Sequence, residues 1–279
     1  MYIAITQNIV NIAASLCFVY LLDMEVAGVA MGTLIAQYAG FFMAILLYIR
    51  YYHTLRKRIV WKDIWQKKAM YRFFQVNRDI FFRTLCLFML TMFGTSAGAA
   101  QGEIVLAVNT LLMQLFTLFS YIMDGFAYAG EALAGRYIGA KNQTGLRNTV
   151  YHLFYWGFGL SLVFTILYSA GGKEFLGLLT NDDSVINASD SYFYWALAIP
   201  LAGFSAFLWD GVFIGATATR QMLYSMLIAS ASFFGIYYAF HSLLGNHALW
   251  LAFLVYLSLR GIVQTFLGRQ IMKKVIVSQ

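Results

Sequence analysis

Eight long apolar stretches, separated by polar gaps, organise this chain of 279 residues. They lie at residues 3–22, 27–49, 79–99, 104–130, 149–170, 191–214, 222–243 and 248–268. Each is long enough to cross roughly 30 Å of hydrocarbon at about 1.5 Å per helical residue. In lipid the backbone must satisfy its own hydrogen bonds, which a helix does within one segment. The pattern therefore predicts an all-α polytopic integral membrane protein with eight transmembrane helices.

The basic residues alternate between the gaps. Sixteen of the nineteen Lys and Arg residues lie in the gaps that follow the second, fourth, sixth and eighth stretches. The other gaps hold Lys173 together with several acids, Asp23, Glu25, Glu103, Glu174, Asp182, Asp183 and Asp190. Because short cytoplasmic loops carry an excess of Lys and Arg, we expect both termini and the basic segment 50–78 on the cytoplasmic side.

Composition supports a membrane protein. The chain is 61% hydrophobic and 11% charged, whereas an average soluble domain is roughly 25% charged. A net charge of +7 raises nucleic acid as a partner. However, the cations flank the spans among Trp and Tyr, where anionic lipid headgroups are the ordinary partner. We therefore expect membrane lipid and no nucleic acid; the pattern carries no signal for an oligomeric state.

No enzyme, metal or cofactor signature is found. Cys17 and Cys86 lie in separate spans, without the spacing of a disulfide framework or zinc site. The four histidines lack paired metal-ligand spacing, and the chain contains no G-x-S-x-G, Walker A or H-E-x-x-H sequence. We expect no catalytic activity and no metal. Any uphill transport must then be driven by a proton or sodium gradient or by another chain.

The basic segment predicts a division of the chain. Val60, Trp61, Ile64 and Trp65 recur among its cations at helical spacing, which favours an amphipathic helix on the cytoplasmic face. Two spans precede this segment and six follow it. Transporters often double a bundle through internal repeats, so the uneven division predicts that helices are missing at the front.

Five ionisable residues lie within or near the ends of spans: Arg83, Asp124, Glu131, Asp210 and Arg260. Charges at membrane depth usually face a protein interior or a water-filled cavity, so each is a functional candidate. Counting residues along each helix puts Arg83, Asp124 and Asp210 in one layer near the cytoplasmic side. We predict that Arg83 pairs with Asp124, Asp210 or both. A purely architectural ion pair and a transport role both fit this pattern.

Three further expectations follow from these helices. Glu131 lies close enough in sequence to Arg136 to predict an interfacial salt bridge. Two buried cations against three buried acids leave a surplus carboxylate, which would suit a proton or another cation. Pro200 interrupts the sixth stretch and should bend it, either as a packing kink or as a moving hinge.

Four motifs resemble one transporter family. They are NRDIFFRTL at 77–85, MDGFAYAGEALAGRYIGAKN at 123–142, LWDGVFIGATATRQM at 208–222 and LGNHALWLA at 244–252. Together they resemble the DinF-like branch of the MATE family, the multidrug and toxic compound extrusion transporters. Members have twelve helices in two six-helix lobes, and they exchange protons or sodium for organic cations or other amphiphiles.

The resemblance implies an arrangement for this chain. Residues 1–50 are similar to the last two helices of the N-terminal lobe, 51–76 to the interlobe linker and 77–279 to the complete six-helix C-terminal lobe. Asp210 matches an acid on the tenth helix of the sodium-coupled branch, and it is our first ion-coupling candidate, followed by Asp124 and Glu131. Arg83 and Arg260 are the charge-partner candidates, and Pro200 is the hinge candidate. The first-helix acid of the DinF-like branch has no counterpart here.

The resemblance predicts a proton- or sodium-coupled antiporter of the bacterial cytoplasmic membrane that exports organic cations, drugs or other amphiphiles. Because four helices are expected to be missing, we also expect an N-terminally incomplete chain. Two alternatives stay open at this point. One is a non-transporting membrane remnant or interaction partner, and the other is a flippase for lipid-linked sugars, which would need a strongly cationic cavity.

Overall fold

The computed structural model describes residues 2–52 and 66–277 of the chain. Its helices are α1 (Tyr2–Tyr20), α2 (Val26–Tyr52), α4 (Lys67–Ala99), α5 (Glu103–Gly139), α6 (Gln143–Gly177), α7 (Asp183–Ser189), α8 (Phe193–Gly215), α9 (Thr219–Leu244) and α10 (Asn246–Val277). Within the described ranges, eight helices are long and apolar enough to cross a membrane. The predicted all-α fold with eight spans is confirmed.

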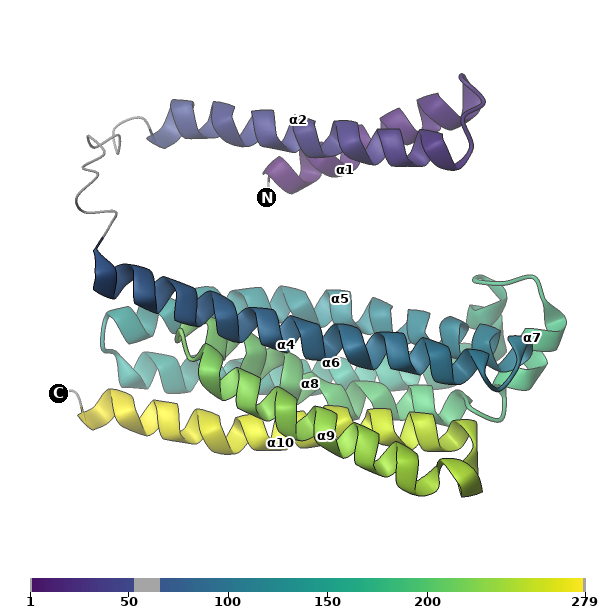
Figure 1. Cartoon of the computed structure of the whole chain (residues 1–279). Helices are drawn as coiled ribbons and strands as arrows, with labels where there is room; N and C mark the ends of the chain where they lie inside the picture. The colour runs from purple at the N-terminus through teal and green to yellow at the C-terminus, as the bar shows by residue number, and fades with distance from the viewer. Residues whose placement is uncertain (1, 53–65, 278–279) are drawn as a thin grey trace. The chain divides into compact units, whose positions relative to one another are not determined.

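The chain divides into two compact units, Met1–Gln66 and Lys67–Gln279. In the first unit, α1 and α2 form a helical hairpin (Figure 1). The Gln7 side chain donates to Gln37 at 3.1 Å, and Asn11 donates to Thr33 at 3.2 Å. Gly32 lies directly against the backbone of Ser15. Small residues and polar pairs of this kind join helices in lipid, where apolar burial offers little driving force.

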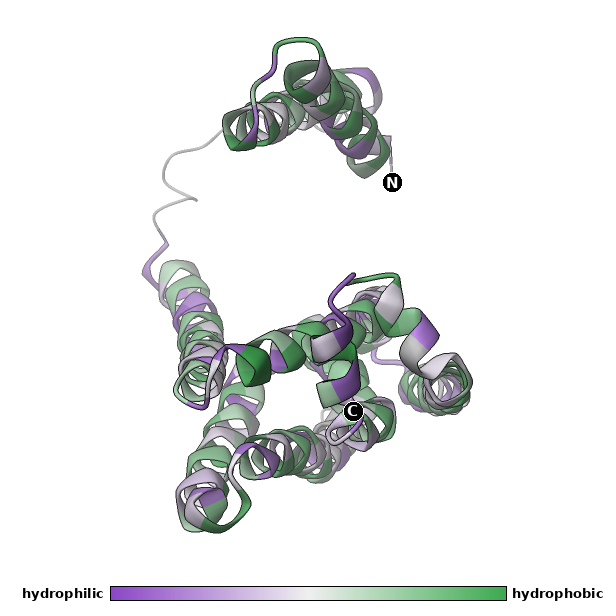
Figure 2. Cartoon of the chain, turned by 90° about the vertical axis from the view of Figure 1, so that its right-hand side faces the viewer, coloured by the Kyte–Doolittle hydropathy of each residue, from purple (hydrophilic) through white to green (hydrophobic). Residues whose placement is uncertain are grey.

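The second unit is a bundle in which α8 lies at the centre. It packs against α5, α6 and α10, while α9 packs against α10 and α4. The reason is visible in its sequence, because α8 is apolar on all faces, as a buried helix must be. Large apolar side chains are also exposed on outer faces of this unit, for example Phe88 on α4 and Ile166 on α6, as hydrocarbon requires. Hydrophobic residues predominate along its helices (Figure 2). At one end the short α7 closes the bundle (Figure 1).

One boundary differs from the sequence prediction, and two predictions stay untested. Residues 67–76, which were assigned to the linker, form the first turns of α4 and continue into the span without a break. The amphipathic helix predicted around Val60, Trp61, Ile64 and Trp65 lies outside the described residues. The helix α8 runs continuously through the buried Pro200, so its role as a hinge stays a prediction.

The clearest break in a helix is in α6, at Gly172. Its backbone angles are φ 37° and ψ −128°, and they interrupt the helical path between Gln143 and Gly177. A positive φ of this kind is disfavoured for residues with a Cβ atom, which explains glycine at this position.

The turn before α7 has the predicted capping chemistry. The carboxylate of Asp182 accepts hydrogen bonds from the backbone N–H of Ser184 at 2.9 Å and from its hydroxyl at 2.6 Å. The hydroxyl and then the backbone bond to Ser184 lower the pKa of Asp182 below its ordinary value. The sequence Thr-Asn-Asp-Asp-Ser at 180–184 therefore starts α7, as expected.

Candidate functional site

Two glycines on α8 bring it into backbone contact with α5. A Cβ atom on Gly211 would collide with the carbonyl of Ala127, and one on Gly215 would collide with the carbonyl of Glu131. Their spacing is the G-x-x-x-G pattern that lets membrane helices approach closely. Asp210 immediately precedes this contact, so the glycines fix the depth and direction of its carboxylate within the bundle.

Asp210 is the centre of a charged cluster, which we define as Arg83, Asp210, Arg260 and Gln264. The residue is 7% exposed. Its Oδ2 atom accepts from Nη2 of Arg83 on α4 and from Nη2 of Arg260 on α10. The other oxygen, Oδ1, accepts from Nε2 of Gln264 at 2.7 Å. Three helices therefore meet at one buried carboxylate, and the predicted pairing of Arg83 with Asp210 is confirmed.

The two arginines are held differently. The Arg260 side chain is 6% exposed, whereas the Arg83 side chain is 21% exposed. Nη1 of Arg260 also donates to the hydroxyl of Tyr256 at 3.4 Å, and that hydroxyl donates to the sulfur of Met226. Arg260 is thus anchored at two points deep in the bundle, while Arg83 connects α4 to the cluster from a more accessible position.

Hydrogen-bonding capacity remains unused in this cluster. Among the described residues, Nε of Arg83, Nε of Arg260 and Oε1 of Gln264 are buried and have no hydrogen-bond partner. An unpaired buried polar atom typically costs about 1–3 kcal/mol. The cluster is therefore polar, buried and incompletely satisfied, and native proteins keep such groups only for a specific reason, of which a functional role is one.

Asp124 on α5 lies near the charged cluster but is not bound within it. It is half-buried and within electrostatic range of Asp210, Arg83 and Arg260. In the described part of the chain it forms no hydrogen bond or ion pair. With Asp124 ionised, Arg83 and Arg260 face two carboxylates, Asp210 and Asp124. The charges are then equal in number, and the extra carboxylate that the sequence predicted is not present at this site.

Glu131 lies apart from this cluster and does not pair with Arg136. No ion pair or hydrogen bond joins it to another described residue, so the predicted salt bridge is wrong. The two residues are five positions apart on α5. At 3.6 residues per turn, such a spacing directs side chains to different faces of the helix.

A further buried acid, Asp79 at the start of the third span, was missed. It is 1% exposed and accepts from Nη2 of Arg78 at 3.0 Å and from the hydroxyl of Thr219 at 3.4 Å. Its position four residues before Arg83 puts both on one face of α4, which was the available signal. In the described ranges, no three His, Cys, Asp or Glu side chains cluster as metal ligands.

A second polar group, which we define as the amide cluster, joins α5 to α10 nearer α7. The side-chain amides of Asn109 and Asn246 donate to each other's carbonyl oxygens at 2.8 Å in both directions. Nε1 of Trp250 donates to Oδ1 of Asn109 at 2.9 Å. All three residues are buried. This cluster was also missed, because uncharged amides in apolar stretches attract no notice in a search for charges.

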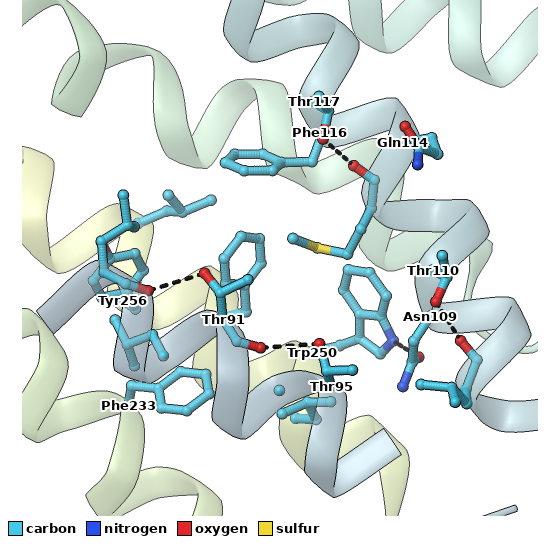
Figure 3. Close-up of a pocket in the computed structure, with 18 of the residues that line it drawn as sticks. Thr91, Thr95, Asn109, Thr110, Gln114, Phe116, Thr117, Phe233, Trp250 and Tyr256 are labelled. Carbon is cyan, nitrogen blue, oxygen red and sulfur yellow. Dashed lines mark hydrogen bonds between the residues drawn. The ribbon is translucent and has the colours of Figure 1, made fainter. Parts of the chain in front are cut away.

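A cavity of about 310 Å³ lies between the two clusters, lined by α4, α5, α9 and α10. Figure 3 shows the aromatic rings of Phe116, Phe233, Trp250 and Tyr256 arranged around it, with threonines from α4 and α5. Its size and mixed lining are typical of a small-molecule site. Arg260 lines this cavity and binds Asp210, so one side chain connects the cavity to the charged cluster.

Comparison with known proteins agrees with this architecture. The family model MatE matches residues 80–240. DNA damage-inducible protein F of Escherichia coli (strain K12) is 36% identical over 92% of this chain and 56% of its own length. Protein DETOXIFICATION 43 of Arabidopsis thaliana is 23% identical over 94% of this chain and 49% of its own. The chain thus spans about half the length of the curated relatives it matches.

The fold has close counterparts among solved structures. The bent form of the Vibrio cholerae MATE transporter VcmN superposes with a TM-score of 0.83 at 15% identity. That alignment covers 99% of this chain and 63% of the solved one. The family model covers more than half of the chain, and its match includes Arg83, Asp124 and Asp210. The chain is therefore a multi-pass membrane protein that belongs to the MATE family, and it resembles the DinF-like branch.

Proposed function

We propose that this chain takes part in cation-coupled antiport, with the charged cluster as its coupling element. The observation that supports this best is a single buried carboxylate, Asp210, shared by arginines from two different helices. A charge cluster inside a membrane bundle is costly to retain and is a functional site by default. Asp210 is also the ion-coupling candidate that the family resemblance indicates.

The proposed coupling works by competition for Asp210. A proton or sodium ion that binds this carboxylate weakens its hold on a guanidinium. Arg83 is the partner that leaves, because its side chain is the more exposed and Arg260 has a second bond to Tyr256. Losing this ion pair removes a direct link from α4 to α8, so ion binding favours a different position of α4. A ligand shifts such an equilibrium only through its differential affinity for the two states.

Asp124 has a separate place in this scheme. Its carboxylate is within electrostatic range of both arginines and has no bound donor among the described residues. It therefore offers a receiving site for Arg83 after release from Asp210, or for the cation before transfer. Glu131, which stands apart from the cluster, is the weakest of the three ion-coupling candidates.

We propose that the cluster lies toward the cytoplasmic face of a bacterial cytoplasmic membrane. The start of α4, the ends of α5 and α10 and the start of α9 meet at one end of the bundle (Figure 1). That end carries Lys67, Lys68, Arg72, Arg136, Lys141, Arg147, Arg220 and Arg269. Positive-inside bias supports a cytoplasmic position for it, and hence for the C-terminus. An even number of spans then predicts the N-terminus on the same side of the membrane. Amphiphiles, including organic cations, are the substrates that the family resemblance predicts.

Reconstituting this chain into proteoliposomes tests the proposal. A fluorescent amphiphile is loaded, and its efflux is followed under an imposed proton gradient, under a sodium gradient and under neither. We expect gradient-dependent efflux that Asp210→Asn abolishes and that Arg269→Gln, an exposed control on α10, leaves unchanged. Efflux that is the same with and without gradients, or that Asp210→Asn retains, would contradict it.

A further inference from the structure

We infer that the cavity between α4, α5 and α10 binds an aromatic amphiphile with an anionic head group, whose anion lies against Arg260. This inference deepens the proposed transport function and rests on it for its biological meaning. It also reverses the charge expected for a substrate, since the family resemblance predicts organic cations. The argument uses the charge of the lining, its hydrogen-bonding groups and its aromatic walls.

The charge of the lining favours an anion. Of the described residues that line the cavity, only Arg260 is charged. Its partner Asp210 does not line the cavity and is shared with a second arginine. The two guanidiniums and one carboxylate of the charged cluster sum to a single positive charge. Asp124, the nearby acid, is not part of the lining either, so a ligand in the cavity meets the cation directly.

Arg260 also has an unused donor. The residue is 5% exposed, and its Nε atom is buried and closed off from the cavity. Its Nη2 atom donates to Asp210 and its Nη1 atom donates to Tyr256, and each of these two nitrogens carries a second N–H. A carboxylate or sulfonate oxygen is the chemical group that satisfies a guanidinium N–H most strongly. A ligand cation offers no acceptor to this donor and is repelled by the same group.

The threonines of the lining define the other end of the ligand. The hydroxyls of Thr91, Thr95, Thr110 and Thr117 each donate to the carbonyl four residues earlier. Their protons are therefore committed, and the oxygens face a ligand only as acceptors. In the amide cluster, both Asn109 and Trp250 are occupied as well. A ligand that extends from Arg260 thus meets threonine acceptors for neutral N–H or O–H groups, together with the side-chain amide of Gln114, which also lines the cavity and can donate or accept. Among the described lining residues there is no second cation.

The walls fit a flat ring system. Phe116 and Phe253 pack edge to face at a centroid distance of 5.2 Å, and Phe233, Trp250 and Tyr256 complete the aromatic lining. Aromatic surfaces of this kind hold flat rings by stacking and by apolar burial. They also attract cations, but that attraction must here overcome a guanidinium in the same cavity. A two-ring aromatic acid combines both features.

The direct test compares an anionic and a cationic probe, which share one naphthalene ring system, on the unaltered chain. Naphthalene-2-carboxylate and trimethyl(naphthalen-2-yl)ammonium are titrated against the chain in zwitterionic nanodiscs, and binding to empty nanodiscs is subtracted. We expect the carboxylate to bind at least about tenfold more tightly, as one added hydrogen bond to a charged group allows. Equal binding, or tighter binding of the ammonium compound, would overturn the inference.

Two substitutions, each with a matched control, test whether the ligand binds in this cavity. A Cβ atom on Gly94, in the cavity lining, meets no other atom within 4 Å, so Gly94→Phe fills the space without a clash at Cβ. We expect it to abolish carboxylate binding, while Gly159→Phe, at an equally open position on α6 outside the lining, leaves binding unchanged. Arg260→Gln should remove the preference for the anion, and Arg269→Gln should keep it. Retained carboxylate binding in Gly94→Phe would overturn the assignment to this cavity even if Arg260→Gln fails to fold.

The binding assay needs no gradient and no transport, so the two proposals fail separately. Anion-selective binding without gradient-dependent efflux would refute the coupled transport and leave the site in place. Gradient-dependent efflux of an organic cation, without anion-selective binding, would refute the site alone.

Discussion

The charged cluster and the amide cluster both tie α10 to its neighbours, but they do so with opposite chemistry. In the amide cluster, two neutral side chains satisfy each other reciprocally and a tryptophan N–H adds a third bond. In the charged cluster, two cations share one carboxylate oxygen and three buried atoms lack partners. The first arrangement has no charge for a proton or sodium ion to change. The second depends on the protonation and the partners of Asp210, so it is the one that an ion gradient can move.

The largest expected effect comes from removing the charge of Asp210. In Asp210→Asn, Arg83 and Arg260 lose the counter-charge that they share. Breaking a buried ion pair in this way typically costs about 3–5 kcal/mol. We expect a large fall in thermal stability in detergent together with loss of coupled efflux. An unchanged melting temperature would show that the two guanidiniums do not depend on this carboxylate.

A smaller effect is expected when the amide cluster is broken. Asn109→Leu leaves the amide of Asn246 and the N–H of Trp250 without an acceptor, which typically costs about 1–3 kcal/mol. Because no charge is involved, this loss should be nearly independent of salt and pH, whereas the loss in Asp210→Asn should vary with both. Thermal melts over a range of sodium chloride and pH distinguish the two. If the stability loss in Asn109→Leu depended on salt as strongly as the loss in Asp210→Asn, the proposed difference between the two clusters would be wrong.

Within the charged cluster, the two arginines should differ. Arg83→Gln leaves Asp210 paired with Arg260 and Gln264, so stability should fall less than in Asp210→Asn. Coupling should nevertheless be lost, because α4 no longer responds to the carboxylate. The measurement is the ratio of gradient-dependent to gradient-independent efflux beside the thermal melt. Arg78→Gln is the matched control on the same helix, since its partner is Asp79 and not Asp210. Coupling retained in Arg83→Gln would exclude the release of Arg83 as the coupling step.

The smallest effect concerns the cap of α7, outside the membrane spans. Because Ser184 lowers the pKa of Asp182, the cap stabilises α7 above the ordinary carboxyl pKa. This contribution is lost as the pH falls through the lower folded pKa. We expect Asp182→Ala to speed amide hydrogen exchange at Ser184 at neutral pH. At a pH below the folded pKa of Asp182, the exchange protection of Ser184 in the unaltered chain should fall to that of the variant. Protection that is equal in both chains at neutral pH would refute the capping role.

Sequence reasoning predicted the spans and the charged pair for clear physical reasons. Apolar length and the position of Lys and Arg relative to a bilayer are properties of the sequence alone, and so is the cost of Arg83 and Asp210 at membrane depth. What it missed depends on the rotation of the helices about their axes. Glu131 and Arg136 are close in sequence, yet they face apart. Gln264 contacts Asp210 only because α10 turns that face inward.

Uncharged features were harder still to predict. The amide cluster and the cavity need the packing of four helices, and no single stretch of sequence signals them. The contact at Gly211 and Gly215 did have a signal, the G-x-x-x-G spacing, which directs attention to the α5–α8 interface and so to the position of Asp210.

Distance measurements between spin labels test the central claim most directly. In a chain without Cys17 and Cys86, one pair joins Phe82 on α4 to Ile262 on α10, two exposed positions beside the charged cluster. A second pair joins Ile104 on α5 to Leu251 on α10, beside the amide cluster. We predict that lowering the pH or adding sodium changes the first distance and not the second, and that Asp210→Asn fixes the first distance at its changed value. A first distance that is the same under all conditions and in Asp210→Asn would contradict the account.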